Sequence, residues 1–282
     1  MKHRYPDFLC IGAQKAGTTW LHENLRDHPA IWLPPVKELQ YFNDLYIPGH
    51  REWTGKHRRT HGVRAFYQHV DKVPRDMWDY RFLGRTADII GEDISDDWYG
   101  RIFTLAAEHQ VCGEMTPEYS LLPAEGIEHL LRLAPEVKII LSLRDPIERN
   151  WSHIRMIARS LPDETPADLR RIASFPDVMA RADYATIIAR WSNFVPSQRN
   201  LILFMDDIAT RPNILMADVC KFLGVEFNEA FFKRLAKPTH VGEKLDIPPE
   251  IYELLKEQLR PFYAEISRLY PELGSKWTAR HY

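Results

Sequence analysis

A loop near the start of the chain carries the residue types that bind phosphate. Phe8–Ile11 is an apolar run of strand length, and Gly12 follows it. Thr18 opens a segment with apolar residues at helical spacing, which ends before Pro29. Gly12 and Gly17 therefore bracket a turn between a strand and a helix. In that geometry, the backbone N–H groups of the loop and the positive end of the helix dipole favour an anion.

The position of the lysine in this loop indicates which kind of phosphate-containing ligand the loop can bind. Gly12 and Gly17 have the spacing of the P-loop of nucleoside triphosphatases, in which Lys and then Ser or Thr follow the second glycine. Here Thr18 and Thr19 follow it, and Lys15 precedes it. A P-loop kinase needs that later lysine for the β- and γ-phosphates and the hydroxyl for Mg²⁺. The loop thus predicts a 5′-phosphate-like group without a metal-bound triphosphate.

A second polar segment directly follows a buried strand. Residues 137–143 (VKIILSL) are strongly apolar, which predicts a strand with both faces covered. Arg144 comes next, at the carboxyl end of the strand, where open α/β sheets bind ligands. Residues 145–148 (DPIE) have the types of a capped helix start, and Arg149 and Ser152 follow at helical spacing. Taken alone, this segment fits a ligand site at the strand end and equally well a surface capping box with an incidental arginine.

Both segments resemble motifs of sulfotransferases that use 3′-phosphoadenosine 5′-phosphosulfate (PAPS). Residues 14–21 (QKAGTTWL) are similar to the family's 5′-phosphosulfate loop, and R-D-P-x-x-R-x-x-S over residues 144–152 is similar to its 3′-phosphate motif. The resemblance implies that PAPS is the co-substrate, without a metal. The cofactor-binding residues that it implies are Gln14, Lys15, Ala16, Gly17, Thr18, Thr19, Trp20, Arg144 and Ser152.

Two residues of the loop carry further expectations. Lys15 would neutralise charge on the leaving 3′,5′-diphosphate, which matters most in the transition state. Trp20 resembles the family's adenine-stacking tryptophan, although its helical phase fits a core residue equally well.

Sulfuryl transfer also needs a base, because the acceptor loses a proton as sulfur passes to it. Residues 35–42 (PVKELQYF) resemble the P-x-x-K-E-x-x-[FY]-F element of heparan-type and many bacterial sulfotransferases, which implies Glu38 as the general base. A solvent-exposed pair of Lys37 and Glu38 is the structural alternative. Histidine is the rival base, as in the hormone-type enzymes, but neither His153 nor His240 lies in a matching motif.

The acceptor side departs from the heparan-type pattern. Residues 114–119 (EMTPEY) resemble its E-K-T-P-x-Y element, but Met115 replaces the lysine, and Asn43 stands where an aspartate is common. The loss of the lysine weakens the case for an anionic glycan. Residues 48–93 lack a clear period and predict loops and short helices of an acceptor-side lid, within an insertion at about 44–110. Its aromatic residues favour a small-molecule or lipophilic acceptor, and a glycan stays open.

Alternating strands and helices predict an α/β, P-loop-like three-layer fold with a central parallel sheet flanked by helices. Further strands are expected at 111–114 and 200–205, and a long helix is expected from Pro248 onward. We therefore expect one sulfotransferase domain over residues 1–282, with Lys15 and Glu38 as its catalytic residues.

Composition and charge exclude other classes. A net charge of −2 gives no basic field for nucleic acid. Three widely spaced cysteines suit neither a disulfide framework nor a zinc site. No apolar run approaches the ~20 residues of a membrane span, and the N-terminus lacks a signal peptide, so a cytoplasmic location is expected.

Two alternatives remain. A P-loop nucleotide or adenylylsulfate kinase would leave the 3′-phosphate motif unexplained, and the G-K-[ST] sequence is absent. A non-catalytic nucleotide-binding protein on the same fold would need neither Lys15 nor Glu38.

Overall fold

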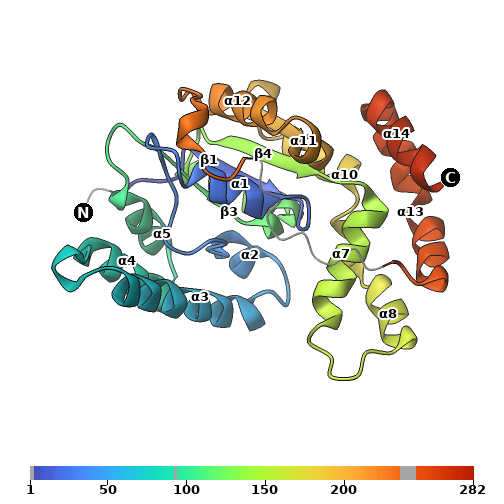
Figure 1. Cartoon of the computed structure of the whole chain (residues 1–282), viewed down its shortest axis with the longest axis horizontal. Coiled ribbons are helices and arrows are strands. Elements are labelled where there is room, and N and C mark those ends of the chain that lie inside the picture. The colour runs from blue at the N-terminus through green and yellow to red at the C-terminus, as the bar shows by residue number, and fades with distance from the viewer. Residues whose placement is uncertain (1–2, 92–93, 236–245) are drawn as a thin grey trace.

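The computed structural model describes residues 3–91, 94–235 and 246–282. Its centre is a five-stranded parallel sheet with the order β2-β3-β1-β4-β5 (Figure 1). The strands are β1 (Phe8–Gly12), β2 (Ile31–Trp32), β3 (Val111–Met115), β4 (Lys138–Leu143) and β5 (Asn200–Phe204). The predicted strands are confirmed, and the two-residue β2 was not foreseen. The chain crosses from one side of β1 to the other between β3 and β4, which places the ligand-binding switch point at the end of β1.

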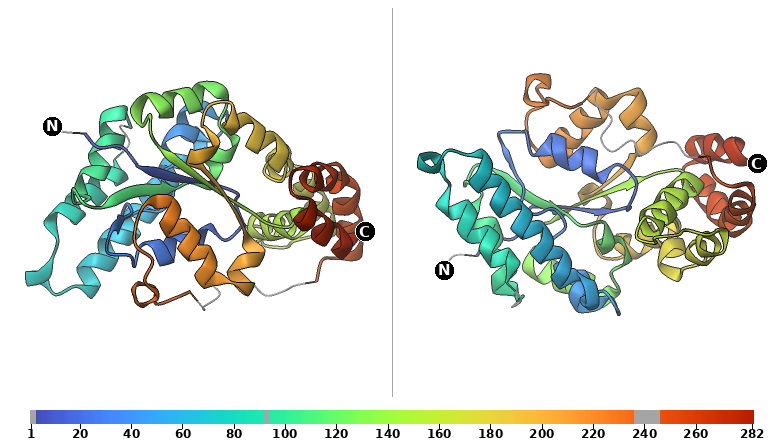
Figure 2. Two further views of the ribbon diagram at one scale, coloured as in Figure 1. Left: turned by 90° about the horizontal axis from the view of Figure 1, so that it is seen from above. Right: turned by 60° about the horizontal axis from the view of Figure 1, so that its bottom comes forward.

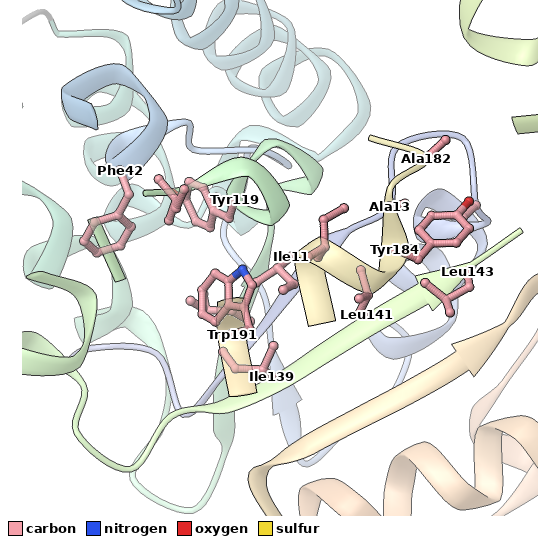
Figure 3. Close-up of a cluster of buried hydrophobic side chains, with 14 of the residues drawn as sticks. Ile11, Ala13, Phe42, Tyr119, Ile139, Leu141, Leu143, Ala182, Tyr184 and Trp191 are labelled. Carbon is pink, nitrogen blue, oxygen red and sulfur yellow. The ribbon is translucent and has the colours of Figure 1, made fainter. Parts of the chain in front are cut away.

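Helices cover both faces of the sheet. Along β1, Phe8 and Cys10 pack in the apolar cluster that includes residues of α1 and α12, whereas Leu9 and Ile11 pack in the cluster on the other face. Figure 3 shows the second cluster, where Trp191 lies close to Ile11 and Ile139. The predicted three-layer fold is therefore confirmed. The helices of the layers are α1 (Thr18–Leu25), α2 (Tyr41–Tyr46), α5 (Asp96–Ile102), α6 (Ala124–Leu133), α7 (Pro146–Ala158), α8 (Pro166–Ala173), α9 (Pro176–Ala180), α10 (Tyr184–Ser192), α11 (Met205–Thr210) and α12 (Pro212–Leu223).

The prediction of loops and short helices for residues 48–93 is wrong. This segment contains α3 (Arg51–Lys72), a helix of 22 residues that packs along α4 (Tyr80–Ile90) (Figure 2). The buried residues of α3 are Thr54, Arg58 and Gly62, at four-residue spacing. Since none of them is a large apolar residue, the helix has no apolar stripe by which its period could be recognised.

A helical pair at the C-terminal end holds α7 in place. It consists of α13 (Pro249–Leu269), which confirms the helix expected from Pro248, and α14 (Pro271–His281). The carboxylate of Asp145 caps α7 and is fully buried. It accepts a hydrogen bond from the Tyr263 hydroxyl at 2.6 Å, and both its oxygens lie 3.1 Å from Nε2 of His281. The helix that follows Arg144 is thus fixed by residues more than 100 positions later.

Arg58 fastens α3 to the rest of the domain, and its loss should be costly. Its guanidinium lies 3.0 Å from the Asp44 carboxylate and donates to the Gln40 carbonyl at 3.2 Å, with both charged side chains buried. Arg58→Ala should lower the free energy of unfolding by about 3–5 kcal/mol, because it leaves Asp44 buried and unpaired. Urea denaturation followed by circular dichroism measures this. The exposed Lys56→Ala on the same helix is the control and should change the value by less than about 0.5 kcal/mol.

Candidate active site

The loop between β1 and α1 is tied to the neighbouring strand β4. The hydroxyl of Ser142 donates to the Ala16 carbonyl at 2.6 Å, and the Ala13 N–H donates to the Ser142 carbonyl at 2.7 Å. Lys15 and Gly17 have φ angles of 71° and 87°, in the left-handed region. These two positions let the chain turn back into α1.

The N-terminus of α1 is open to an anion. No side chain caps it, and its first turn contains no acidic residue. The first N–H groups of a helix have no partner within the helix and carry the positive end of its dipole. Thr18 is buried at this end, and the hydroxyl of Thr19 accepts a hydrogen bond from Nζ of Lys37 at 3.3 Å. The loop and the helix end therefore have the geometry of an anion site, and the binding of a phosphate group there stays a prediction.

Several cations gather around Lys15. Burial lowers the pKa of its ammonium group, and the positive charges of Arg159, Arg144, Lys37 and Arg149 lower it further. Arg159 was not singled out in the sequence, because it lies beyond the recognised motif. Mutual repulsion between these groups is relieved when a multiply charged anion binds among them.

Arg144 brings the two predicted phosphate motifs together. Its Nη1 donates to the Lys15 carbonyl at 3.2 Å, and its Nη2 lies 3.1 Å from the Glu148 carboxylate. Ser152 lies about two turns further along α7 and is partly exposed. The structure thus joins Arg144 to the loop, while the binding of a 3′-phosphate by Arg144 and Ser152 stays a prediction.

Arg149, within this motif, and His153, directly after it, are buried. Arg149 donates to the Val178 carbonyl at 2.7 Å, and burial lowers the pKa of its guanidinium to about 9. The other guanidinium nitrogen contacts Nδ1 of His153. Burial, followed by the Arg149 charge, lowers the pKa of His153 to about 2. His153 is therefore neutral at physiological pH, and it packs against Arg149.

Trp20 lies on the core side of α1. It is buried in the apolar cluster of that face, and its indole N–H donates to the Leu235 carbonyl at 3.3 Å. Its stacking on adenine stays a prediction. Met115, which stands in place of the family's lysine, is buried in the same cluster. His240 lies outside the described residues.

Glu38 lies next to the anion site, with 21% of its side chain exposed. One carboxylate oxygen is 2.7 Å from Nζ of Lys37, which also reaches Thr19 at the start of α1. The other oxygen lies 4.0 Å from Nε2 of His57 on α3 and 3.5 Å from Nε2 of Gln40. Lys37 therefore links the proposed base to the phosphate-binding helix end.

Sequence reasoning missed another carboxylate in the site, Glu118. It follows β3 in the 3₁₀ helix η3 (Pro117–Leu121) and is only 2% exposed. One of its oxygens accepts a hydrogen bond from the amide of Gln14 in the loop at 3.0 Å, and the other accepts one from Gln40 at 3.2 Å. It occupies the variable position of the T-P-x-Y element, so motif matching passes over it.

A family model described as "Sulfotransferase family" matches residues 6–229. The chain belongs to the sulfotransferase family. The activity of this family is the PAPS-dependent transfer of a sulfuryl group, and the resemblance stated from the two motifs is confirmed.

The relatives include glycan-modifying enzymes. Human bifunctional heparan sulfate N-deacetylase/N-sulfotransferase 2 is 24% identical over 79% of this chain and 22% of its own length. Human carbohydrate sulfotransferase 15 is 24% identical over 96% of this chain and 54% of its own length. The chain therefore spans about a fifth to about half of these relatives. A solved sulfotransferase from Alicyclobacillus acidocaldarius has the same fold, with a TM-score of 0.63 and 21% identity over 94% of this chain and 95% of that one.

Among the residues that the structure describes, no helix has the length and apolar character needed to cross a bilayer. The cytoplasmic location expected from the sequence stays a prediction.

The lowered pKa of Lys15 predicts a pH-dependent affinity for 3′,5′-diphosphoadenosine (PAP), the desulfated product. The charged lysine attracts the diphosphate, so the affinity should fall as the pH rises through this pKa, below the ordinary value of 10.5. Titration calorimetry from pH 7 to 10 measures this. In Lys15→Arg the charge persists throughout, since arginine has a pKa above 12, so the alkaline loss should disappear. An equal loss in both proteins would contradict the assignment.

Proposed function

We propose that this protein transfers the sulfuryl group of PAPS to a hydroxyl group, or less readily to an amine, of an acceptor. The observation that carries the proposal is the anion site at the end of β1, where Lys15 and Arg144 meet, with Glu38 beside it. A phosphosulfate fits this site because the helix end is uncapped and the surrounding cations are in excess.

The proposed reaction is an in-line displacement at sulfur. The acceptor oxygen forms a bond to sulfur as the bond from sulfur to the bridging oxygen breaks, and PAP leaves with that electron pair. Glu38 takes the proton of the acceptor hydroxyl. Lys15 and the N–H groups of α1 stabilise the charge that develops on the leaving group. Arg144 and Ser152 hold the 3′-phosphate, and the remaining residues of the loop, 14–20, hold the rest of the co-substrate.

Of the two histidines weighed against Glu38, His153 lies among the described residues, and Glu38 is the better placed base. Its carboxylate is partly exposed and adjoins the anion site. His153, by contrast, is buried against Arg149 with a pKa of about 2, so it holds a proton too weakly to serve as a general base near neutral pH.

We propose that α3 and α4 form the acceptor-side lid of a single domain over residues 1–282, within the insertion at about 44–110. His57 on α3 supports this, because its imidazole faces Glu38. Of the aromatic side chains expected in the lid, Trp98 and Tyr99 are buried in the core. Trp53, on the same helix as His57, stays partly exposed. A small or lipophilic acceptor remains our proposal, with a glycan as the alternative.

Nucleotide affinities and acceptor turnover distinguish a sulfotransferase from the two alternatives, a kinase and a non-catalytic binding protein. A sulfotransferase should bind PAP more tightly than adenosine 5′-diphosphate, without Mg²⁺, because of the 3′-phosphate. Arg144→Ala should remove most of that difference, roughly tenfold or more, since a charged hydrogen bond contributes about 1.5–3 kcal/mol. Calorimetry with both nucleotides measures the two affinities. Tighter, Mg²⁺-dependent binding of ATP would instead support a kinase, and PAP binding without turnover of any acceptor would support a binding protein.

Glu38→Gln tests the base directly. Transfer from ³⁵S-labelled PAPS to a panel of alcohols and amines should fall by roughly 10²-fold or more, because the amide cannot accept the proton. PAP affinity, measured by calorimetry, should stay unchanged, since the two side chains are nearly isosteric. His153→Ala serves as the comparison. If Glu38→Gln keeps its activity while His153→Ala loses it without unfolding, the mechanism belongs with the histidine-base enzymes.

A further inference from the structure

A buried carboxylate, Glu118, lies beside the proposed base. Among the described residues it makes no ion pair, and its oxygens accept side-chain hydrogen bonds from the amides of Gln14 and Gln40. The same nitrogen of Gln40 lies 3.2 Å from Glu118 and 3.5 Å from Glu38. One amide group therefore bridges two acidic side chains, one buried and one facing the anion site.

The nearby Glu114 shows what a structural carboxylate in this fold looks like. It is also buried, but it accepts four hydrogen bonds. The donors are the hydroxyls of Tyr99 (2.7 Å), Tyr119 (2.8 Å) and Thr116 (3.1 Å) and the backbone N–H of Leu39 (3.3 Å). Glu118 has two side-chain donors, both amides, so its burial is less compensated. A carboxylate that is costly to bury and lies beside a candidate base points to a role in the site.

The charges around the pair are unevenly distributed. Burial raises the pKa of Glu118, the charge of Glu38 raises it further, and Arg181 opposes both. Arg181 already pairs with Asp177 at 3.1 Å. On the other side, Lys37 and His57 face Glu38. The cations therefore lie on the Glu38 side, and Gln40 separates them from the buried Glu118.

The oxygen atoms of the two amides that contact Glu118 are also informative. Among the described residues, the carbonyl oxygens of both Gln14 and Gln40 are buried and have no hydrogen-bond partner. An amide can present its oxygen to a protonated carboxyl group and its N–H₂ group to an ionised one. The two amides are therefore suited to either charge state of Glu118.

We propose that Glu118 is a positioning residue: it holds Gln40, which contacts Glu38, and Gln14 of the phosphosulfate loop, and so keeps the pair of Glu38 and Glu118 in register with the co-substrate. This inference rests on the proposed role of Glu38. When Glu118 is ionised, its negative charge favours transfer of the acceptor's proton to Glu38. Through Gln14, the same side chain holds the pair in register with the loop that binds the co-substrate.

Glu118→Gln removes the charge and keeps the shape. The acid limb of the pH–rate profile should move to lower pH by roughly one unit, because the proposed base has lost a negative charge near it. Turnover on the plateau should fall several-fold, well short of the roughly 10²-fold loss expected for removing the base itself. The pH–rate profile is measured with ³⁵S-labelled PAPS and the best alcohol of the panel. A parallel series without the alcohol measures transfer to water, which is the hydrolysis of PAPS. PAP affinity and the melting temperature are measured on the same samples.

Two further variants make the result decisive. Glu118→Asp keeps the charge, so its acid limb should stay at the wild-type pH. Glu125→Gln, an exposed residue of α6, makes the same charge change away from the site and should leave the profile unaltered. A wild-type profile for Glu118→Gln, or its failure to fold, overturns the inference, because the charge would then matter only for the fold or not at all. If Glu38→Gln itself keeps its activity, the proposed base is wrong; if only the Glu118 result fails, the base stands.

Discussion

The candidate site depends on holding like charges together before any anion is bound. Lys15 is half-buried, and three arginines and a second lysine lie close enough to lower its pKa. Contacts to the rest of the fold hold these repelling groups in place. Strand β4 fixes the loop, and the buried Asp145 fixes the helix after Arg144. An arrangement of this kind does not need to reorganise when charge develops on a leaving group, which is the physical basis of electrostatic catalysis.

Three carboxylates lie next to this positively charged region, and each has different partners. Glu148 pairs with Arg144, Glu38 pairs with Lys37, and Glu118 accepts hydrogen bonds from the amides of Gln14 and Gln40. In the function that we propose, cations dominate on the co-substrate side, and Glu118, which has no ion-pair partner among the described residues, lies on the acceptor side. A proton leaving the acceptor and a charge leaving the sulfur would therefore move in opposite directions, each toward groups of the sign that receives it.

The sequence predicted the parts of the site that depend on strand ends. Gly12 and Arg144 each follow a strongly apolar run, and carboxyl ends of adjacent parallel strands meet at one sheet edge, so their proximity followed from pattern alone. Neither α3 nor Glu118 could be found this way. The buried face of α3 consists of Thr54, Arg58 and Gly62, which carry no apolar period. Glu118 lies at a motif position that tolerates any residue, and only the folded chain brings Gln14 and Gln40 to it.

The contacts of Asp145 with Tyr263 and His281 affect the order in which parts of the protein fold. The histidine that contacts this carboxylate is 136 residues further along the chain, and the tyrosine is 118 residues further. Contacts between residues so far apart in the sequence form slowly, because the entropy cost of closing a long loop comes before the contact can stabilise the fold. During synthesis, the loop after β1 and the strands beside it are complete long before α13 and α14 emerge. Arg144 gains the support of Asp145 only then, so a growing chain can assemble its sheet well before Arg144 is firmly held.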